Sequence, residues 1–200
     1  MLLLPLLWIF HAHAIDLVGI ESGHPSTSVT VSAGANGPTT DAFIAAILDV
    51  DHYPLTATYM GVKALSSTKK LATLADGTVV LHQVTGGNVL VRPRQYVTAL
   101  KVVTRTDTVA DVQWFLVKHT QNADGTFSGP YAETLNAHRE EAVYTPYTHG
   151  TWHYDRAAGT IRYSTESDAG GALPSWAVSE SAVTAFPKEL MRVRWGIVAP

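Results

Sequence analysis

The chain ends in a long helical stripe that follows a succession of strand-like segments, and this order limits the folds it can adopt. The stripe recurs at spacings of three and four, as one buried helix face does. Its members are Trp176, Ser179, Val183, Phe186, Leu190, Val193 and Ile197. Pro174 is expected to open the helix, whereas Pro187 must interrupt it and bend it. A bent helix of this length can follow a twisted sheet.

The segment before this helix indicates an antiparallel meander. Apolar and polar residues alternate, and turn sequences such as ADG, TGGN and NADG separate the runs. The expected strands are 26–34, 61–66, 78–85, 95–105, 109–120, 142–155 and 159–165. Residues 122–141 are a long polar connection, which we expect to be a surface excursion and not core.

One short helix is predicted between the first two strands, in the sequence PTTDAFIAAILDV. Thr39 or Thr40 can cap it, and Asp41 suits the positive end of its first turn. The sequence DVDHYP then ends it, because a residue that precedes proline is disfavoured in the α region.

Composition narrows the class of protein. Two hundred residues suit one domain, and only 16% are charged, against roughly a quarter in typical soluble domains. The chain therefore has more apolar surface than usual to hide, in a core or in a lined cavity. The net charge is −3 and the basic residues are scattered, which argues against a nucleic-acid partner. The absence of cysteine excludes disulfides and thiolate chemistry.

The N-terminal sequence MLLLPLLWIFHAHAID has features of a signal peptide. Residues 2–10 are an apolar run, and Ala12-His13-Ala14 has the small-x-small form of a cleavage site, although no Lys or Arg precedes the run. The run is too short to span a bilayer. We expect residues 1–14 to be a signal peptide and 15–200 a single domain in the periplasm or outside the cell. The alternative is a cytoplasmic protein whose N-terminal apolar residues pack on the domain.

Four fragments resemble the START and polyketide-cyclase-like superfamily, which is also called Bet v 1-like. They are TTDAFIAAILDVDHYP, VRPRQYVTAL, GTWHYD and YSTESDAGGALPSWAV, and they span the chain in the family's order. In the second, Gln95 replaces a usual aspartate. The resemblance implies an α+β helix-grip fold. In it, a curved antiparallel sheet of about six or seven strands wraps around the long C-terminal helix, with a short helical region after the first strand.

The fourth fragment is expected to be architectural. Asp168 can accept hydrogen bonds from free amides, and Gly170 or Gly171 is expected to have a positive φ, so that the chain turns back across the sheet.

Catalytic and metal-binding patterns are weak. His149 and His153 would share a strand face, but a metal site needs three or four converging ligands. Asp49, Asp51 and His52 are more typical of a solvated helix end, and the chain has no G-x-S-x-G elbow or phosphate-binding glycine loop. We therefore expect no metal and no cofactor, we assign no catalytic residue, and we leave enzymatic activity open.

The resemblance implies a ligand cavity between the sheet and the C-terminal helix. The residues expected to line it are Trp114, Leu116, Trp152, Tyr154, Tyr163, Trp176, Val183 and Phe186. Ordinary core packing is the alternative interpretation for the same residues. Candidates for contact with a polar or anionic head group are Arg92, Arg94, Lys101 and Arg162, although exposed positions are expected for most of them.

The leading functional hypothesis is the binding or transport of a hydrophobic, lipid-like or sterol-like molecule by a monomer that contacts membranes transiently. One alternative is a cyclase or aromatase that acts on a polyketide-like substrate in the same cavity. Another is an interaction module whose cavity is filled by its own side chains.

Overall fold

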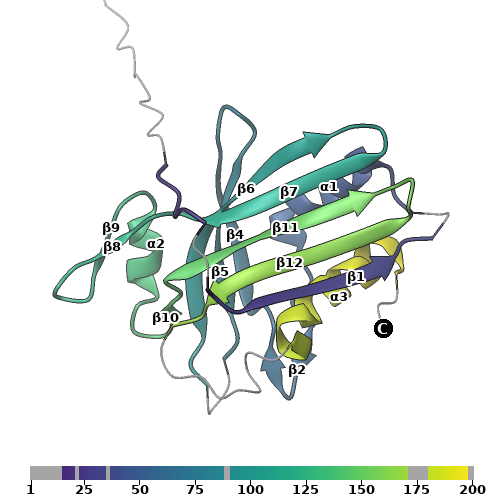
Figure 1. Cartoon of the computed structure of the whole chain (residues 1–200). Helices are drawn as coiled ribbons and strands as arrows, with labels where there is room; N and C mark the ends of the chain where they lie inside the picture. Colours follow the sequence, from purple (N-terminus) through teal and green to yellow (C-terminus); the bar gives the residue numbers. More distant parts are fainter. Residues whose placement is uncertain (1–14, 21–22, 35–36, 88–90, 171–179, 198–200) are drawn as a thin grey trace, which may run out of the picture.

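One large sheet dominates the computed structural model, which describes residues 15–20, 23–34, 37–87, 91–170 and 180–197 (Figure 1). In the described part of the chain this sheet has eight strands, and seven follow the antiparallel order β1-β12-β11-β7-β6-β5-β4. Their bounds are β1 Ser26–Ser32, β4 Ser67–Thr73, β5 Val79–Thr85, β6 Arg94–Arg105, β7 Val109–Leu116, β11 Tyr147–Asp155 and β12 Thr160–Asp168. The eighth, β10 (Val143–Tyr144), pairs parallel with β6.

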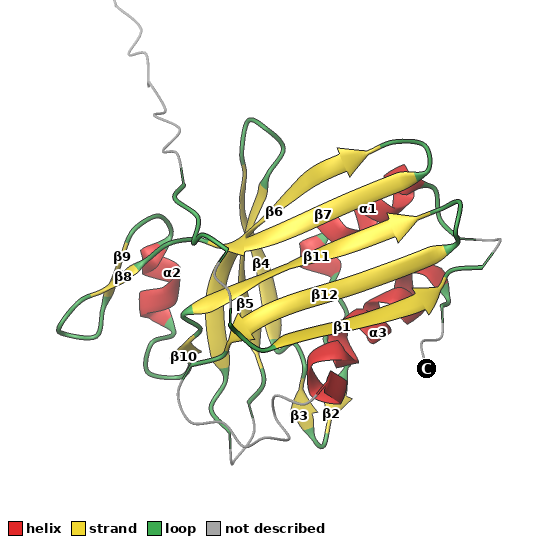
Figure 2. Cartoon of the chain, viewed as in Figure 1, coloured by secondary structure: helices red, strands yellow, loops and turns green. Residues whose placement is uncertain are grey.

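Two helices lie on one side of this sheet. The sheet curves toward α1 (Thr40–Leu48) and α3 (Glu180–Trp195), so that they face its concave side (Figure 2). Register shifts between Lys70 and Ala72 and between Val102 and Thr104 accompany the curvature, as bulges increase local twist. The expected helix-grip arrangement is confirmed, with a sheet of eight strands.

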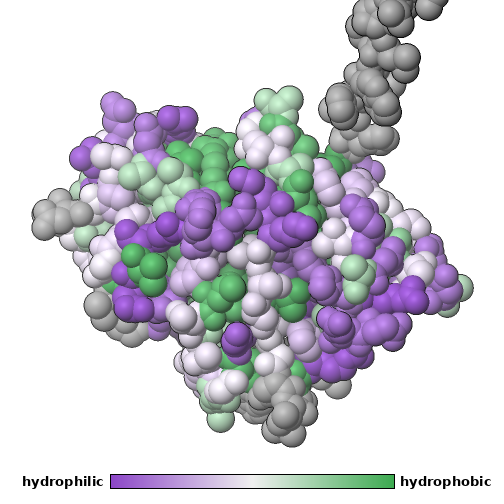
Figure 3. All heavy atoms as spheres, turned by 180° about the vertical axis from the view of Figure 1, so that it is seen from behind, coloured by the Kyte–Doolittle hydropathy of each residue, from purple (hydrophilic) through white to green (hydrophobic). Residues whose placement is uncertain are grey.

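Several smaller elements lie outside the large sheet and its two helices. They are the 3-10 turn η1 (Val50–His52), the hairpin of β2 (Thr58–Tyr59) and β3 (Val62–Lys63), the hairpin of β8 (Thr120–Gln121) and β9 (Phe127–Ser128), and α2 (Ala132–Ala137). Viewed from the opposite side to Figure 1, hydrophobic groups are interspersed with hydrophilic ones on the surface (Figure 3).

The alternating pattern of each strand separates two hydrophobic clusters. On β7, Val112 and Trp114 point to the concave face, whereas Asp111 and Gln113 lie on the outer face. The concave-face cluster includes Phe43 and Ile47 of α1, Leu190 and Met191 of α3, and Ile161 of β12.

The second cluster lies on the outer face, where α2 covers β5 and β6. Leu135 of α2 is fully buried against Val80, Val97 and Ala99, together with Phe127 of β9. The interpretation of 122–141 as a surface excursion outside the core is therefore wrong for these two residues. The many polar residues around them obscured a single amphipathic turn.

Several strand boundaries also differ from the prediction. The expected strand 61–66 is replaced by the β2–β3 hairpin. The neighbouring strand β4 was not predicted, because its lysines weaken the alternation of apolar and polar residues. The expected strand 142–155 is divided in two around Pro146, which cannot donate to a ladder. Thr39 is the cap of α1, and its hydroxyl accepts a hydrogen bond of 3.1 Å from Ala42 N–H.

The C-terminal helix is confirmed only over its described part. Residues 171–179, and with them the expected start at Pro174, lie outside the described residues. The helix continues through Pro187, which is buried. Val193 is 51% exposed, so the predicted stripe is interrupted there, whereas Ile197 follows the end of the helix and is buried in the concave-face cluster.

Candidate ligand cavity

A cavity of about 440 Å³ lies between the concave face of the sheet, α3 and the β2–β3 hairpin. This volume falls in the range of small-molecule sites, roughly 300–1,000 Å³. The strands that contribute most of its wall are β5, β6, β7, β11 and β12, whose inward residues alternate along each strand.

One part of the wall is apolar and aromatic, and we call it the apolar end. It comprises Leu65, Leu81, Leu100, Trp114, Trp152, Tyr163, Val183 and Phe186. The Tyr163 ring stacks on Trp114 with centroids 5.1 Å apart, and it meets Trp152 edge-on at 4.8 Å. These contacts fix the aromatic groups against the sheet, so they form a preformed wall.

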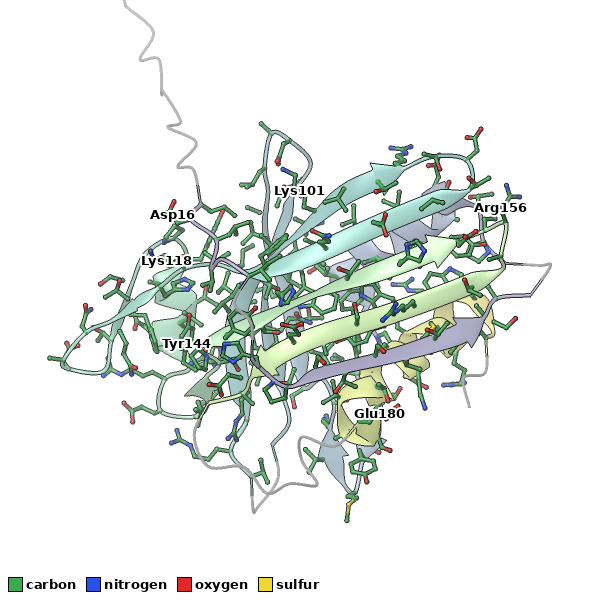
Figure 4. All side chains as sticks on the ribbon, in the orientation of Figure 1. Asp16, Lys101, Lys118, Tyr144, Arg156 and Glu180 are labelled. Atoms are coloured by element: carbon green, nitrogen blue, oxygen red, sulfur yellow. The ribbon has the colours of Figure 1, made fainter. Side chains whose placement is uncertain are left out.

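The other part, which we call the polar end, lies where β6 begins and β12 ends. It comprises Arg92, Arg94, Thr145, Thr148, Thr165, Ser167 and Asp168. It is the end of the sheet nearest to Tyr144 and α2, opposite to Arg156 (Figure 4). Thr145 and Thr148 belong to this wall, and their hydroxyls make no hydrogen bond to another described residue.

Arg94 is the buried cation of the polar end, with 7% of its surface exposed. Its guanidinium donates to the carbonyl oxygens of Arg92 at 2.6 Å, Ala169 at 3.3 Å and Gly170 at 3.0 Å. No carboxylate of the described residues forms an ion pair with it. Burial, followed by the nearby charge of Arg92, lowers the pKa of Arg94.

The turn after β12 has the predicted geometry. Asp168 Oδ1 accepts a hydrogen bond of 2.8 Å from Gly170 N–H, and Gly170 has φ +67°. A Cβ on Gly170 would stand 2.8 Å from the carbonyl oxygen of Tyr144. Glycine is therefore required there both by φ and by space.

Three tyrosines of the wall are held neutral. Burial raises the pKa of Tyr96 to about 12, and it also raises the pKa of Tyr53 and of Tyr163. A neutral phenol donates a hydrogen bond and cannot act as a base near neutral pH. Tyr53 uses its hydroxyl to donate to the carbonyl of Ile47.

The C-terminal half of α3 is tied to the segment after α1. Arg194 Nη2 donates to Asp49 Oδ2 and to His52 O, each at 2.9 Å. Thr56 Oγ1 donates to Glu189 Oε1 at 2.8 Å. This half of the helix is therefore anchored by polar contacts as well as by packing.

The predicted cavity residues are only partly brought together. Trp114, Trp152, Tyr163, Val183 and Phe186 all border the cavity, and their role in ligand binding stays a prediction. Phe186 belongs to the stripe that was expected to be a buried helix face, but it is only partly buried. Trp176 lies outside the described residues.

Leu116 and Tyr154 do not line this cavity. Leu116 is buried near the N-terminal segment, where its carbonyl oxygen accepts from Val18 N–H. Tyr154 packs on Phe43 and donates to Pro38 O at 2.7 Å, beyond the apolar end. Both share the concave face with the cavity residues, but periodicity alone does not show how far the cavity runs along a strand.

Of the four basic residues considered for contact with a head group, two line the cavity and two do not. Arg92 and Arg94 line the cavity, whereas Arg162 is exposed on the outer face. Lys101, labelled in Figure 4, forms an exposed ion pair of 3.3 Å with Asp76. The buried hydroxyls at Thr145, Thr148 and Thr165 were missed, because threonine in a strand gives no functional signal of its own.

Metal-binding clusters of His, Cys, Asp or Glu are not found among the described residues. His153 Nδ1 instead pairs with Asp111 Oδ1 at 2.6 Å on the outer face, and His149 contacts Tyr147. Within the described ranges, no helix is long and apolar enough to cross a membrane.

Comparison with solved structures confirms the resemblance at the level of the fold. Human STARD10 superposes with a TM-score of 0.57 at 13% identity, over 90% of this chain and 71% of that one. A STAR-related lipid transfer protein from Xanthomonas axonopodis superposes with a TM-score of 0.55 at 16% identity, over 90% and 98% of the two chains. No family model matches the sequence, and neither does any curated protein. The chain has the helix-grip fold of START domains.

Proposed function

We propose that the chain binds a hydrophobic, lipid-like molecule in the cavity between its sheet and α3, and carries it. The observation that supports this most is the preformed aromatic wall of a cavity of about 440 Å³. The name of the Xanthomonas protein, a lipid transfer protein, is consistent with the same class of ligand.

The apolar end would supply most of the affinity. Each methylene buried there contributes about 0.8 kcal/mol. The polar groups at the start of β6 would orient the ligand, as a few fixed polar groups do in most small-molecule sites.

Entry of the ligand requires part of the wall to move. Residues 50–58 and 85–92 contribute Tyr53, Thr85, Gly86 and Arg92 to the wall. Because Glu189 and Arg194 anchor the C-terminal half of α3, we propose that opening occurs at the other half of this helix and at the adjacent loops.

The cyclase alternative receives less support. It needs converging acid and base groups, but the lining tyrosines are held neutral by burial. Asp168 is a carboxylate of the wall, and one of its oxygens accepts the backbone N–H of Gly170. We therefore favour binding over catalysis.

A pair of substitutions on α3 tests the binding site. Val183→Trp places a large side chain at the cavity wall, and Val193→Trp places the same side chain on the exposed side of the helix. We expect V183W to weaken binding of the dye Nile red at least tenfold and V193W to leave it unchanged. Equal affinity in both variants would contradict the location of the site. Mass spectrometry of lipids extracted from natively purified protein would identify the ligand.

We further propose that the protein is exported and acts as a monomer with transient membrane contact. Export is supported by the apolar run 2–10 and the Ala-His-Ala sequence at 12–14. An exported carrier of this kind would exchange its cargo at a membrane surface.

A further inference from the structure

The polar end of the cavity contains more positive than negative charge. Arg94 and Arg92 line it together with one carboxylate, that of Asp168. Arg92 is exposed and donates to Glu140 O at 2.8 Å, which is a carbonyl and carries no full charge. Both guanidinium groups are thus held by backbone carbonyls.

A buried cation is costly unless an anion compensates it. Three of the five N–H groups of Arg94 donate to carbonyl oxygens, which leaves two without a described partner. The buried hydroxyls of Thr145 and Thr148 lie in the same wall and add two further donors. This collection of donors suits an acceptor-rich, negatively charged group.

The apolar end of the cavity indicates the chemistry of the part of the ligand that lies away from Arg94. A molecule that reaches from Arg94 along the inward residues of β6 passes Tyr96 and Thr98 and then meets Leu100, which is paired with Trp114. Polarity therefore falls along one strand of the wall. A ligand that matches it has a charged head and a hydrocarbon tail.

We propose that the cavity ligand is an anionic amphiphile whose carboxylate or phosphate head is bound by Arg94 and Arg92 and whose tail occupies the apolar end. This inference rests on the proposed function, since it names the class of ligand for the same cavity. Arg162 and Lys101 have no part in it, because the first lies on the outer face and the second pairs with Asp76.

Displacement of Nile red from the protein by three single-chain lipids tests the proposal. The competitors are hexadecanoate, 1-palmitoyl lysophosphatidic acid and neutral 1-palmitoylglycerol, each below its critical micelle concentration. We expect at least one acidic lipid to compete at least tenfold better than the neutral lipid. The stronger of the two acids then distinguishes a carboxylate head from a phosphate head.

Substitutions of the arginines test whether the preference for acidic lipids depends on Arg94. Arg94→Gln should weaken the better acid at least tenfold and leave 1-palmitoylglycerol unchanged, because it removes a charged donor and no apolar wall. Arg94→Lys should retain part of the preference. Arg162→Gln, an exposed arginine of the same sheet, is the matched control and should behave as the unmodified protein. If Arg94→Gln does not fold, Arg92→Gln provides the same comparison at an exposed position.

Two results would overturn the inference and leave the proposed function intact. One is equal competition by the acidic and neutral lipids. The other is an equal loss of affinity for all three lipids in Arg94→Gln, with no loss in Arg92→Gln. That result would mean that Arg94 only stabilises the turn at 169–170 through its hydrogen bonds. If neither Nile red nor any lipid binds, the proposed function itself is wrong.

Discussion

Gly150 of β11 lies directly opposite Trp114 of β7, and the indole of Trp114 occupies the space where a side chain of residue 150 would stand. A Cβ on Gly150 would collide with two carbon atoms of that indole and with the carbonyl oxygen of Ser164. The glycine therefore determines where an aromatic wall of the cavity can lie.

Gly150→Ala should consequently destabilise the domain by about 3 kcal/mol, because the clash involves backbone as well as a ring held by Tyr163. Urea denaturation followed by circular dichroism measures this. Gly19→Ala is the control, since a Cβ there meets nothing within 4 Å. Unchanged stability of the 150 variant would mean that Trp114 has another place to go.

Phe186 and Leu190 stand one turn apart on α3 but differ in surroundings. Leu190 is fully buried in the core, and Phe186 is partly buried at the cavity wall, where its ring lies 5.1 Å from that of Tyr53. Leu190→Ala should cost about 2–5 kcal/mol, as core truncations do. Phe186→Ala should cost less than about 3 kcal/mol, because part of the ring already faces open space.

The same two variants should also differ in their affinity for a hydrophobic ligand. Phe186→Ala widens the cavity and should change the affinity for a fluorescent fatty acid or sterol, whereas Leu190→Ala should not. Thermal unfolding with and without the ligand measures both effects. A Phe186 variant unchanged in stability and binding would show that α3 does not close the cavity.

His82 should make stability depend on pH. It is buried on the outer face beside Gln95, and burial lowers its pKa from 6.5 to about 4. The unfolded chain therefore takes up a proton that the folded chain does not between about pH 6.5 and 4. Stability is full above this window and falls by about 2 kcal/mol between pH 7 and pH 5.

Replacing His82 with Gln should remove most of that pH dependence. Denaturant titrations of both proteins at pH 7 and pH 5 provide the comparison. His119, whose pKa is also lowered by burial, should account for part of what remains. A variant with the full pH dependence of the original protein would exclude His82 as its source.

The mature protein should begin at Ile15, if residues 1–14 are removed as proposed. N-terminal sequencing of protein from its native host decides this. A chain that still begins at Met1 would contradict export. Residues 15–18 themselves contact the domain, since Val18 N–H donates to Leu116 O and Lys118 N–H donates to Asp16 O.

Local sequence rules were sufficient for the turn at Asp168 and Gly170 and for the cap of α1 at Thr39. In both, the residues that make the hydrogen bond lie within three positions of each other, so residue type and spacing determine the geometry. Alternation likewise placed Trp114, Trp152 and Tyr163 on one face of the sheet, because a strand has a fixed period of two.

The boundaries of the cavity depended on contacts between distant segments. Leu116 and Trp114 share a strand face, yet only Trp114 lines the cavity, whereas Leu116 is buried beside the N-terminal segment, where its carbonyl oxygen accepts from Val18 N–H. Arg92 and Arg162 are both exposed arginines, and only the first lines the cavity, where it donates to the carbonyl oxygen of Glu140, a residue distant in sequence.

The sequence by itself therefore determined the order of elements, the faces of the strands and the local turns, since these follow from periodicity and short-range hydrogen bonding. The tertiary structure alone decided which inward residues border empty space, which cation of the wall has no carboxylate partner among the described residues, and that α2 buries Leu135. Those properties depend on how far apart the packed elements stand, and separation in space is not encoded in the spacing of residues along one strand.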